Sequence, residues 1–192
     1  MKLKDFPPFA SIVVLLAVGV MIGLGIWQLG RHQEKTALIA EYAAVDQDRP
    51  PVIFETIADN TEAKLYRPVS GICQTVRSIE SGAGTAANGA KGWAHTANCV
   101  VGDGLEVPVV LGWTLEPETP SWDGGEFEGI LAPGPRIVAE PALAGLGQLA
   151  RPDPSDLPNN HLAYAGQWFF FALVALVIFA LAVRGRAKKR DG

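Results

Sequence analysis

Two groups of polar and aromatic residues stand at the inner ends of two hydrophobic stretches. The first group is Trp27, Gln28, Arg31, His32 and Lys35. The second group is Asn160, His161, Tyr164, Gln167 and Trp168. Anchoring at a membrane surface explains the aromatic rings, since such side chains commonly occupy the headgroup layer. It explains less well why imidazole, amide and cationic groups, which are suited to holding a ligand, gather at the same level.

The two hydrophobic stretches, residues 9–29 and 162–183, contain 21 and 22 residues without a charged side chain. At roughly 1.5 Å per residue, helices of that length cover a hydrocarbon core of about 30 Å. We therefore predict two transmembrane helices. A cleaved secretory signal is the alternative for the first stretch, but the run is long for a signal and leads to Arg31 and Lys35 rather than to a cleavage site.

Packing of the two helices against each other would bring the two polar groups face to face. Gly19 and Gly23 form a Gly-x-x-x-Gly pair on the first stretch, which would allow another helix to approach closely. The second stretch offers small residues at Ala172, Ala175 and Ala182. Because small residues are common in membrane helices, this pattern alone indicates pairing only weakly.

Cations flank the hydrophobic stretches on their outer sides. They are Lys2, Lys4, Arg184, Arg186, Lys188, Lys189 and Arg190. The positive-inside rule places both ends, residues 1–8 and 184–192, in the cytoplasm and residues 30–161 in the opposite compartment. Residues 31–160 carry 9 Lys plus Arg against 18 Asp plus Glu, a net charge of −9. This acidic balance argues against nucleic-acid binding, which requires a basic surface.

The middle of the chain has the pattern of one small domain rich in strands. Residues 31–44 are rich in helix formers, so the first helix is expected to continue beyond the membrane. Strand-like sequences follow at 66–76, 93–101, 105–115, 127–131 and 136–140. A hairpin turn is expected at 102–104, and the Gly/Ala/Ser-rich run 81–92 is expected to be a mobile surface loop. The predicted fold is a membrane protein in which two transmembrane α-helices bracket a small β-rich α+β extracytoplasmic domain with a mainly antiparallel sheet.

The two cysteines, Cys73 and Cys99, both fall in predicted strands on the translocated side. An oxidising compartment would allow them to form a disulfide, and a pair of buried free thiols is the alternative. A zinc site is disfavoured because His95 is the only nearby imidazole and a fourth ligand is missing. For His95 itself, we expect a structural role.

The sequence lacks the common signatures of enzymes. It contains no Gly-x-Ser-x-Gly nucleophile motif, no phosphate loop and no Gly-x-Gly-x-x-Gly placed between a strand and a helix. The informative chemistry instead lies in the two groups of polar and aromatic residues at the ends of the hydrophobic stretches.

Several motifs along the chain resemble those of the Surfeit locus protein 1 family of cytochrome oxidase assembly factors. The run Gly25-Ile-Trp27-Gln28-Leu-Gly-Arg31 with Lys35 is similar to the family's signature at the end of its first span. The run Asn160-His161-Leu-Ala-Tyr164-Ala-Gly-Gln167-Trp168-Phe169 is similar to the signature that enters its second span. Tyr66 to Gly71, Gly92-Trp93 and Gly112-Trp113 match the central landmarks in order. One departure is Leu111, where the family usually has an arginine.

The resemblance implies a site for haem a at the outer membrane surface. It points to His161 as the axial ligand of the haem iron, since neutral imidazole is a common ligand of this kind. Arg31 and Lys35 would pair with the propionates. Trp27, Tyr164 and Trp168 would pack against the ring, with Gln28 and Gln167 completing the pocket. His32, about 100° from Arg31 on a helix, is a second-choice ligand.

The resemblance also implies a role and a location. The chain would be a chaperone-like assembly factor for a haem-copper terminal oxidase, and not an enzyme. It would lie in the bacterial inner membrane and assist delivery of haem a to the catalytic subunit. Its expected partners are that subunit and the lipid bilayer, with haem a synthase as a further candidate. The alternative is a scaffold or accessory subunit without a cofactor, in which His161 and Arg31 serve as anchors. A haem-modifying enzyme is disfavoured because few acid-base groups accompany His161.

Overall fold

The computed structural model describes residues 8–190, with side chains up to Arg186. Most of the predicted cytoplasmic N-terminus, residues 1–7, and the last two residues of the basic tail lie outside the described part. The chain divides into two compact units, one formed by residues 1–39 and 158–192 and the other by residues 40–157. We refer to the described parts of these units as the helix pair and the β-domain.

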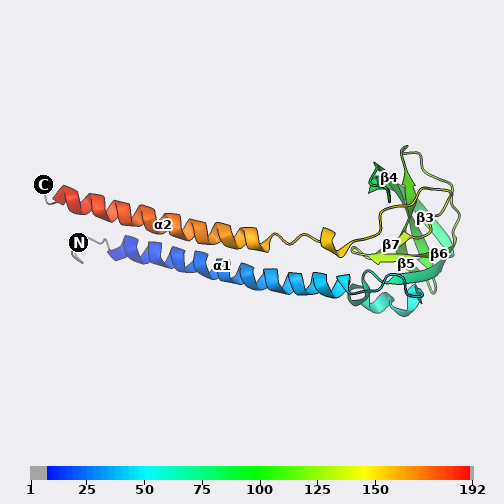
Figure 1. Ribbon diagram of the computed structural model, residues 1–192, viewed down its shortest axis with the longest axis horizontal. Coiled ribbons are helices and arrows are strands. Elements are labelled where there is room, and N and C mark those ends of the chain that lie inside the picture. Colours follow the sequence, from blue (N-terminus) through cyan, green and yellow to red (C-terminus); the bar gives the residue numbers. More distant parts are fainter. Residues whose placement is uncertain (1–7, 191–192) are drawn as a thin grey trace. The chain divides into compact units, whose positions relative to one another are not determined.

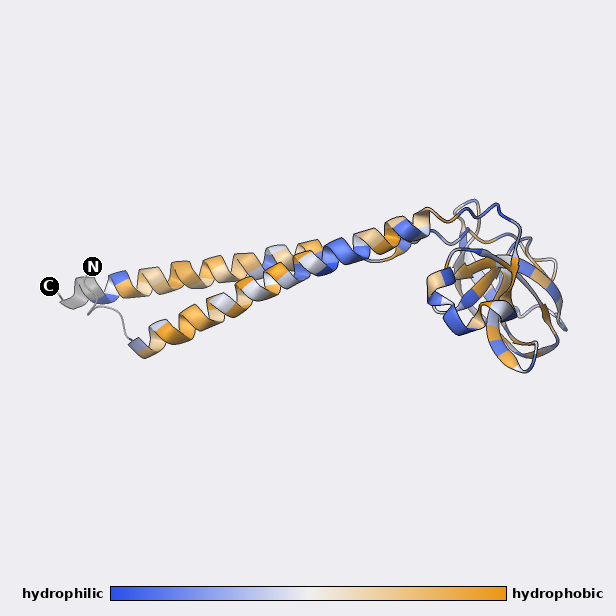
Figure 2. Cartoon of the chain, turned by 90° about the horizontal axis from the view of Figure 1, so that it is seen from below, coloured by the Kyte–Doolittle hydropathy of each residue, from blue (hydrophilic) through white to orange (hydrophobic). Residues whose placement is uncertain are grey.

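Two long helices make up the helix pair. The helix α1 (Pro8–Ala43) has 36 residues, and α2 (His161–Arg190) has 30. Both are long and apolar enough to cross a membrane, judged by length and composition. The two helices lie side by side (Figure 1), and apolar residues line both (Figure 2). The expected continuation of the first helix through residues 31–43 is confirmed.

The β-domain contains a seven-stranded sheet in the order β1-β2-β6-β7-β5-β4-β3. The strands are β1 (Val52–Ile53), β2 (Pro68–Cys73), β3 (Thr75–Thr85), β4 (Lys91–Val101), β5 (Leu105–Thr114), β6 (Gly125–Ala132) and β7 (Arg136–Ala139). Four short 3-10 helices, η2 (Phe54–Thr56), η3 (Ala58–Asn60), η4 (Glu62–Lys64) and η5 (Pro154–Asp156), lie in the connections. The domain is therefore built almost entirely from strands and turns.

The sheet is mixed, so the expectation of a mainly antiparallel arrangement holds for most of its strand pairs but not for all. Four neighbouring pairs are antiparallel, but β1 runs parallel to β2 and β5 runs parallel to β7. The β4–β5 and β6–β7 hairpins occur where the turn residues indicate them. The β5–β7 pair arises because β7 inserts between β5 and β6, whereas β1 and β2 are joined through the short helices η2, η3 and η4. Local turn residues encode neither of these pairings.

The Gly/Ala/Ser-rich run 81–92 was expected to be a loop, and this prediction is wrong. Residues 81–85 complete β3, residues 91 and 92 begin β4, and only the turn between them is irregular. The small residues serve close strand contact, because a Cβ on Gly84 would lie 2.7 Å from the Cβ of Ala94. The small residues of this run therefore indicate closely packed strands rather than a mobile loop.

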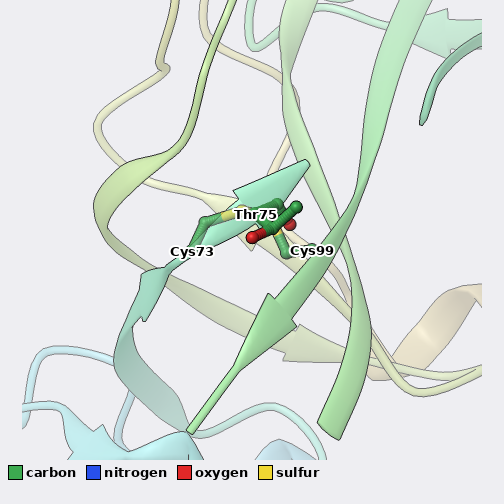
Figure 3. The surroundings of a disulfide bond; sticks show 3 residues. All are labelled: Cys73, Thr75 and Cys99. Atoms are coloured by element: carbon green, nitrogen blue, oxygen red, sulfur yellow. Dashed lines mark hydrogen bonds between the residues drawn. A yellow bond between two sulfur atoms is a disulfide. The ribbon is translucent and has the colours of Figure 1, made fainter. Parts of the chain in front are cut away.

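The chain itself joins two distant parts of the sheet. Only Gln74 separates β2, which pairs with β6, from β3, which pairs with β4. The Gln74 backbone N–H donates to the carbonyl of Val100 at 2.9 Å. A disulfide joins Cys73 of β2 to Cys99 of β4, with a Cα–Cα distance of 5.2 Å (Figure 3). This bond and the shared strand connection close the sheet around its core.

The core of the β-domain lies inside this closed sheet. Fully buried side chains include Val69, Val109, Leu111, Leu131 and Ile137. Leu111, the position at which the family usually has an arginine, is therefore an ordinary core residue in this chain. Its apolar side chain contributes to burial without requiring a partner.

Two of the landmark glycines are explained by contacts that leave no space for a side chain. A Cβ on Gly92 would lie 2.3 Å from the carbonyl oxygen of Thr114. A Cβ on Gly112 would lie 2.5 Å from the Cβ of Leu146 and 2.9 Å from the carbonyl oxygen of Gly147. These glycines allow β4, β5 and the following segment to approach one another closely.

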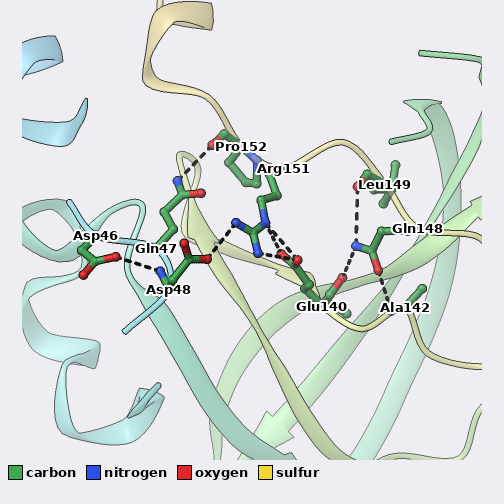
Figure 4. A network of polar contacts seen from close by, with 10 residues as sticks. Asp46, Gln47, Asp48, Glu140, Ala142, Gln148, Leu149, Arg151 and Pro152 are labelled. Atoms are coloured by element: carbon green, nitrogen blue, oxygen red, sulfur yellow. Dashed lines mark hydrogen bonds and ion pairs between the residues drawn. The ribbon is translucent and has the colours of Figure 1, made fainter. Parts of the chain in front are cut away.

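A polar network ties together the two segments that enter and leave the β-domain (Figure 4). Arg151 donates to both carboxylate oxygens of Glu140 at 2.8 and 2.9 Å, and its Nη1 lies 3.3 Å from Oδ1 of Asp48. The Gln47 side chain donates to the carbonyl of Pro152 at 3.3 Å. The residues after α1 are thereby joined to those that lead back toward α2.

Candidate functional site

The helix pair is built on one seam of less exposed residues. On α1 these residues include Val14, Val18, Met21, Gly25, Gln28, His32 and Lys35. On α2 they include His161, Ala165, Trp168, Ala172 and Ala175. Their spacing alternates between three and four residues, which is the pattern that keeps a contact stripe on one side of a helix.

A close contact at Gly25 shows how tightly the seam is packed. A Cβ on Gly25 would lie 2.5 Å from Cε1 of Phe169. By contrast, a Cβ on Gly19 or Gly23 would meet no atom within 4 Å, so the predicted Gly-x-x-x-Gly pair lies away from this seam. The glycine that allows α1 to approach α2 is therefore Gly25.

The polar end of the seam begins with His161, the first residue of α2. Its Nδ1 lies 2.7 Å from Oε1 of Gln28 on α1. Because an amide oxygen can only accept, Nδ1 carries the proton and donates it. In the neutral form of such an imidazole, the lone pair is on Nε2, which is the arrangement of a metal-ligating histidine oriented by its other nitrogen.

A second polar contact lies one helical turn farther along α1. Nδ1 of His32 lies 3.1 Å from Oδ1 of Asn159, and the Asn159 amide donates to Oγ1 of Thr36 at 3.1 Å. The Thr36 hydroxyl in turn donates to the backbone carbonyl of His32 at 2.8 Å. Asn159 therefore bridges two positions on α1 and fixes the start of α2.

The two predicted cations have different surroundings. Arg31 forms an ion pair with Glu34 at 2.5 Å, and both side chains are more than half exposed. An exposed pair one helical turn apart stabilises little, so Arg31 can exchange this partner for another anion at low cost. Lys35 is partly buried on the seam side of α1, in register with Gln28 and His32.

The predicted aromatic residues also differ in placement. Trp27 and Tyr164 are 56% and 50% exposed and lie away from the seam. Trp168 is partly buried in the seam and contacts Phe171 edge-to-face, with ring centroids 6.3 Å apart. Gln167 is exposed. The structure therefore brings Gln28, Lys35, His161 and Trp168 to one stripe and leaves Trp27, Arg31, Tyr164 and Gln167 on the outer faces.

Sequence reasoning missed Asn159 and Thr36. It singled out the neighbouring Asn160, whose backbone carbonyl accepts from the Tyr164 N–H at 3.2 Å in the first turn of α2. The available signal was the pair of asparagines before the second hydrophobic stretch. Which of them faces α1 depends on the angle at which the chain enters α2, and the sequence does not fix that angle.

The third histidine, His95, lies inside the β-domain and is fully buried. Its Nε2 lies 2.9 Å from the Thr114 hydroxyl, and its Nδ1 lies 2.9 Å from the Ser81 hydroxyl. Because Thr114 donates to the carbonyl of Glu116, its oxygen accepts from Nε2–H and Nδ1 accepts from Ser81. Burial lowers the pKa of His95, with a smaller opposing effect from a hydrogen bond to the Glu116 backbone. Both ring nitrogens are therefore used within the β-domain.

The described residues contain no cluster of three or more His, Cys, Asp or Glu side chains that could hold a metal ion. A porphyrin supplies four nitrogen ligands to its iron and leaves only the axial positions for protein groups. The imidazole of His161, oriented through its Nδ1, could fill one axial position.

Comparison with known proteins identifies the family. The sequence model of the SURF1 family matches residues 15–173, from within α1 through the β-domain into α2. A comparison with curated proteins gives no match. The SURF1 family is associated with cytochrome c oxidase assembly, and its members are assembly factors rather than known catalytic enzymes. Since the match covers most of the sequence and agrees with the end motifs, the chain belongs to the SURF1 family.

Proposed function

We propose that this protein assists the assembly of a haem-copper oxidase by holding haem a at the polar end of the seam, with His161 as the axial ligand. The observation that carries the proposal is the 2.7 Å contact between His161 Nδ1 and Gln28 Oε1. In a neutral imidazole, this contact selects the tautomer with the proton on Nδ1 and leaves the Nε2 lone pair available, without a hydrogen-bond partner among the described residues. Bound haem would supply the iron centre that the oxidase requires, and the chain's own groups would bind and orient it.

The proposed membrane arrangement follows the charge distribution of the sequence. Residues 9–29 and 162–183 would span the bacterial inner membrane, with residues 1–8 and 184–192 in the cytoplasm and residues 30–161 in the periplasm. The polar end of the seam would then lie at the periplasmic surface. That depth would allow an apolar macrocycle to remain among lipid-facing side chains while its propionates reach water.

The remaining predicted residues divide by position. Arg31, exposed and paired with Glu34, and Lys35 on the seam side would bind the propionates. Trp27 and Tyr164 offer exposed rings beside the polar residues, and Trp168 closes the seam below them. Gln28 is a positioning residue because it acts through His161. Release to the oxidase catalytic subunit is favoured by a site with one strong ligand.

The test is the haem content of the full-length protein purified after co-expression with haem a synthesis. The wild-type protein should show a Soret band, and His161→Ala should abolish it. His32→Ala is the matched control, because His32 lies in the same seam and its Nδ1 likewise contacts an amide oxygen, that of Asn159. It should keep the haem, and loss of haem in His32→Ala alone would make His32 the ligand instead. Gln28→Ala should weaken haem binding by about 10–100-fold, the range found for partners that orient a metal ligand.

Two results would contradict the proposal. An unchanged haem content and visible spectrum in His161→Ala would remove His161 as the ligand. A wild-type protein without a Soret band would favour a cofactor-free scaffold that stabilises oxidase intermediates through its helices.

A further inference from the structure

Asn159 lies two residues before His161, the first residue of α2, and its side chain makes three contacts with α1. Its Oδ1 lies 3.1 Å from Nδ1 of His32. Its Nδ2 donates to Oγ1 of Thr36 at 3.1 Å and to the backbone carbonyl of His32 at 3.4 Å. In the described part of the chain, these contacts supply the hydrogen bonds between residues 158–160 and α1. We call them the Asn159 bridge.

His161 needs a second point of attachment because of its place in α2. Residues 158–160 form no regular secondary structure, so no preceding helical turn holds His161. Residues at the ends of helices open readily. The contact of His161 with Gln28 is a single hydrogen bond, which offsets about the entropy cost of ordering one backbone residue. By itself, that contact would leave the imidazole free to turn about one bond.

The Asn159 bridge adds an attachment farther along α1. Gln28, His32 and Thr36 follow one another at intervals of four residues, which places their side chains about 6 Å apart along one side of the helix. His161 contacts the first of these residues, and Asn159 contacts the other two. Two attachments at different heights fix both the position and the direction of the residues between them. The bridge therefore restricts rotation of His161 about its contact with Gln28.

The carboxamide of Asn159 is suited to this role because it can donate and accept at once. Its Nδ2 group donates to Thr36 and to the His32 carbonyl, so its Oδ1 accepts from Nδ1 of His32. The two donor contacts do not involve the His32 ring, so they remain in His32→Ala. The neighbouring Asn160 is exposed, whereas Asn159 is partly buried. The two adjacent asparagines are thus distinguished by their contacts with α1.

We propose that Asn159 is a positioning residue for the haem ligand. It holds the start of α2 against α1, so that His161 keeps its Nδ1 on Gln28 and presents Nε2 in one direction. The inference rests on the proposed function, since the group to be held is the haem bound by His161. When the binding-competent arrangement is only partly populated, the apparent affinity falls in proportion. Loss of the Asn159 bridge therefore weakens haem binding, although Asn159 itself does not touch the haem.

The first test needs no haem. It records nitrogen-15 spectra of the histidine rings in the full-length apoprotein in detergent, at about pH 8, above the usual pKa of histidine. His161→Ala identifies the signals of His161. The wild type should carry the proton on Nδ1 of His161, and Asn159→Ala should show a mixture of the two tautomers. Asn160→Ala removes the same amide from the neighbouring exposed position and should leave the wild-type signals unchanged.

The second test measures how fast haem leaves the loaded protein when excess apomyoglobin is present as an acceptor. Asn159→Ala should lose haem about tenfold faster, at the low end of the range for partners that orient a metal ligand. Its visible spectrum before transfer should match that of the wild type, because His161 remains the ligand. Thr36→Val should have a smaller effect. The double variant should lose haem no faster than Asn159→Ala alone, since both substitutions remove the same contact.

Failure of this inference can be distinguished from failure of the proposed function. An unchanged tautomer of His161 in Asn159→Ala, or equal haem loss from Asn159→Ala and Asn160→Ala, overturns the positioning role. Additive effects in the double variant with Thr36→Val also overturn it, because the two residues would then act separately. A wild-type protein without a Soret band, or a His161→Ala protein that keeps its haem, overturns the proposed function and the haem part of this inference with it.

Discussion

The helix pair and the β-domain bury their residues in different ways. In the helix pair, one stripe on each helix is shielded, and most large apolar side chains, such as Leu16, Phe170 and Ile178, remain exposed. In the β-domain, a closed sheet shields a core on all sides and a disulfide links its strands. The helix pair joins polar groups of both helices at one end, whereas polar side chains of the β-domain link its own segments to one another. Under the proposed function, ligand binding belongs to the helix pair and the β-domain is a separate, internally stabilised unit.

The largest expected change in stability comes from removing the disulfide, which only the β-domain contains. Cys73 and Cys99 are 26 residues apart, and constraining a loop of that length in the unfolded chain is worth about 3–4 kcal/mol. The double variant Cys73→Ala, Cys99→Ala should lower the unfolding free energy of the β-domain by that amount. Urea denaturation followed by far-UV circular dichroism measures the change.

The same variant also tests whether the two units are independent. Hydrogen exchange in residues 161–175 of α2 should remain as in the wild type, because the disulfide lies wholly within the β-domain. Faster exchange in α2 would show that the stability of the helix pair depends on that of the β-domain.

The second prediction concerns the seam. Gly25→Leu would place its side chain against the ring of Phe169, where a Cβ alone is already 2.5 Å from Cε1. Overpacking of this kind costs about 1–3 kcal/mol, so the Gln28–His161 contact should open and hydrogen exchange in the first turns of α2 should accelerate. Gly23→Leu is the matched control, since open space surrounds that position. Equal effects of the two substitutions would mean that Gly25 does not set the helix spacing.

The sequence predicted the helices and the local hairpins well because their signals are local. Twenty or so apolar residues without charge indicate a spanning helix, and the glycine turn after Val101 indicates the β4–β5 hairpin. Non-local features were beyond this reasoning: the parallel pairing of β5 with β7, and the use of residues 81–85 as a strand packed on Ala94. At the candidate site, the residue types indicated His161 and Gln28. Whether Arg31 or His32 lies on the side of α1 that contacts α2 depends on the register of the two helices. Neither hydrophobic stretch encodes that register by itself.

The third prediction is a dependence of β-domain stability on pH through His95. Burial lowers the pKa of His95 below its usual 6.5, so the unfolded chain binds a proton before the folded chain does. The contribution of the neutral, buried His95 side chain to the free energy of unfolding is therefore complete above pH 6.5. As the pH falls from 6.5 toward the folded-state pKa, the free energy of unfolding decreases by no more than about 1.4 kcal/mol per pH unit. Denaturation between pH 7.5 and 5.5 should show this slope in the wild type. His95→Gln should flatten it, and an unchanged slope would assign the effect to other groups.

The smallest expected effect comes from Arg151, which joins the entering and leaving segments of the β-domain. Hydrogen bonds to Glu140 and Asp48 raise the pKa of Arg151, so its charge is kept at all physiological pH values. Because the side chain is 48% exposed, solvent screens these pairs, and Arg151→Gln should cost no more than about 1 kcal/mol in thermal or urea unfolding. Arg77→Gln is the control, because its contact with Glu106 is 3.7 Å long and more exposed, and it should be neutral. High salt should reduce the difference between the two variants, whereas a salt-independent loss for Arg151→Gln would mean that packing of its stem, rather than charge, holds the two segments together.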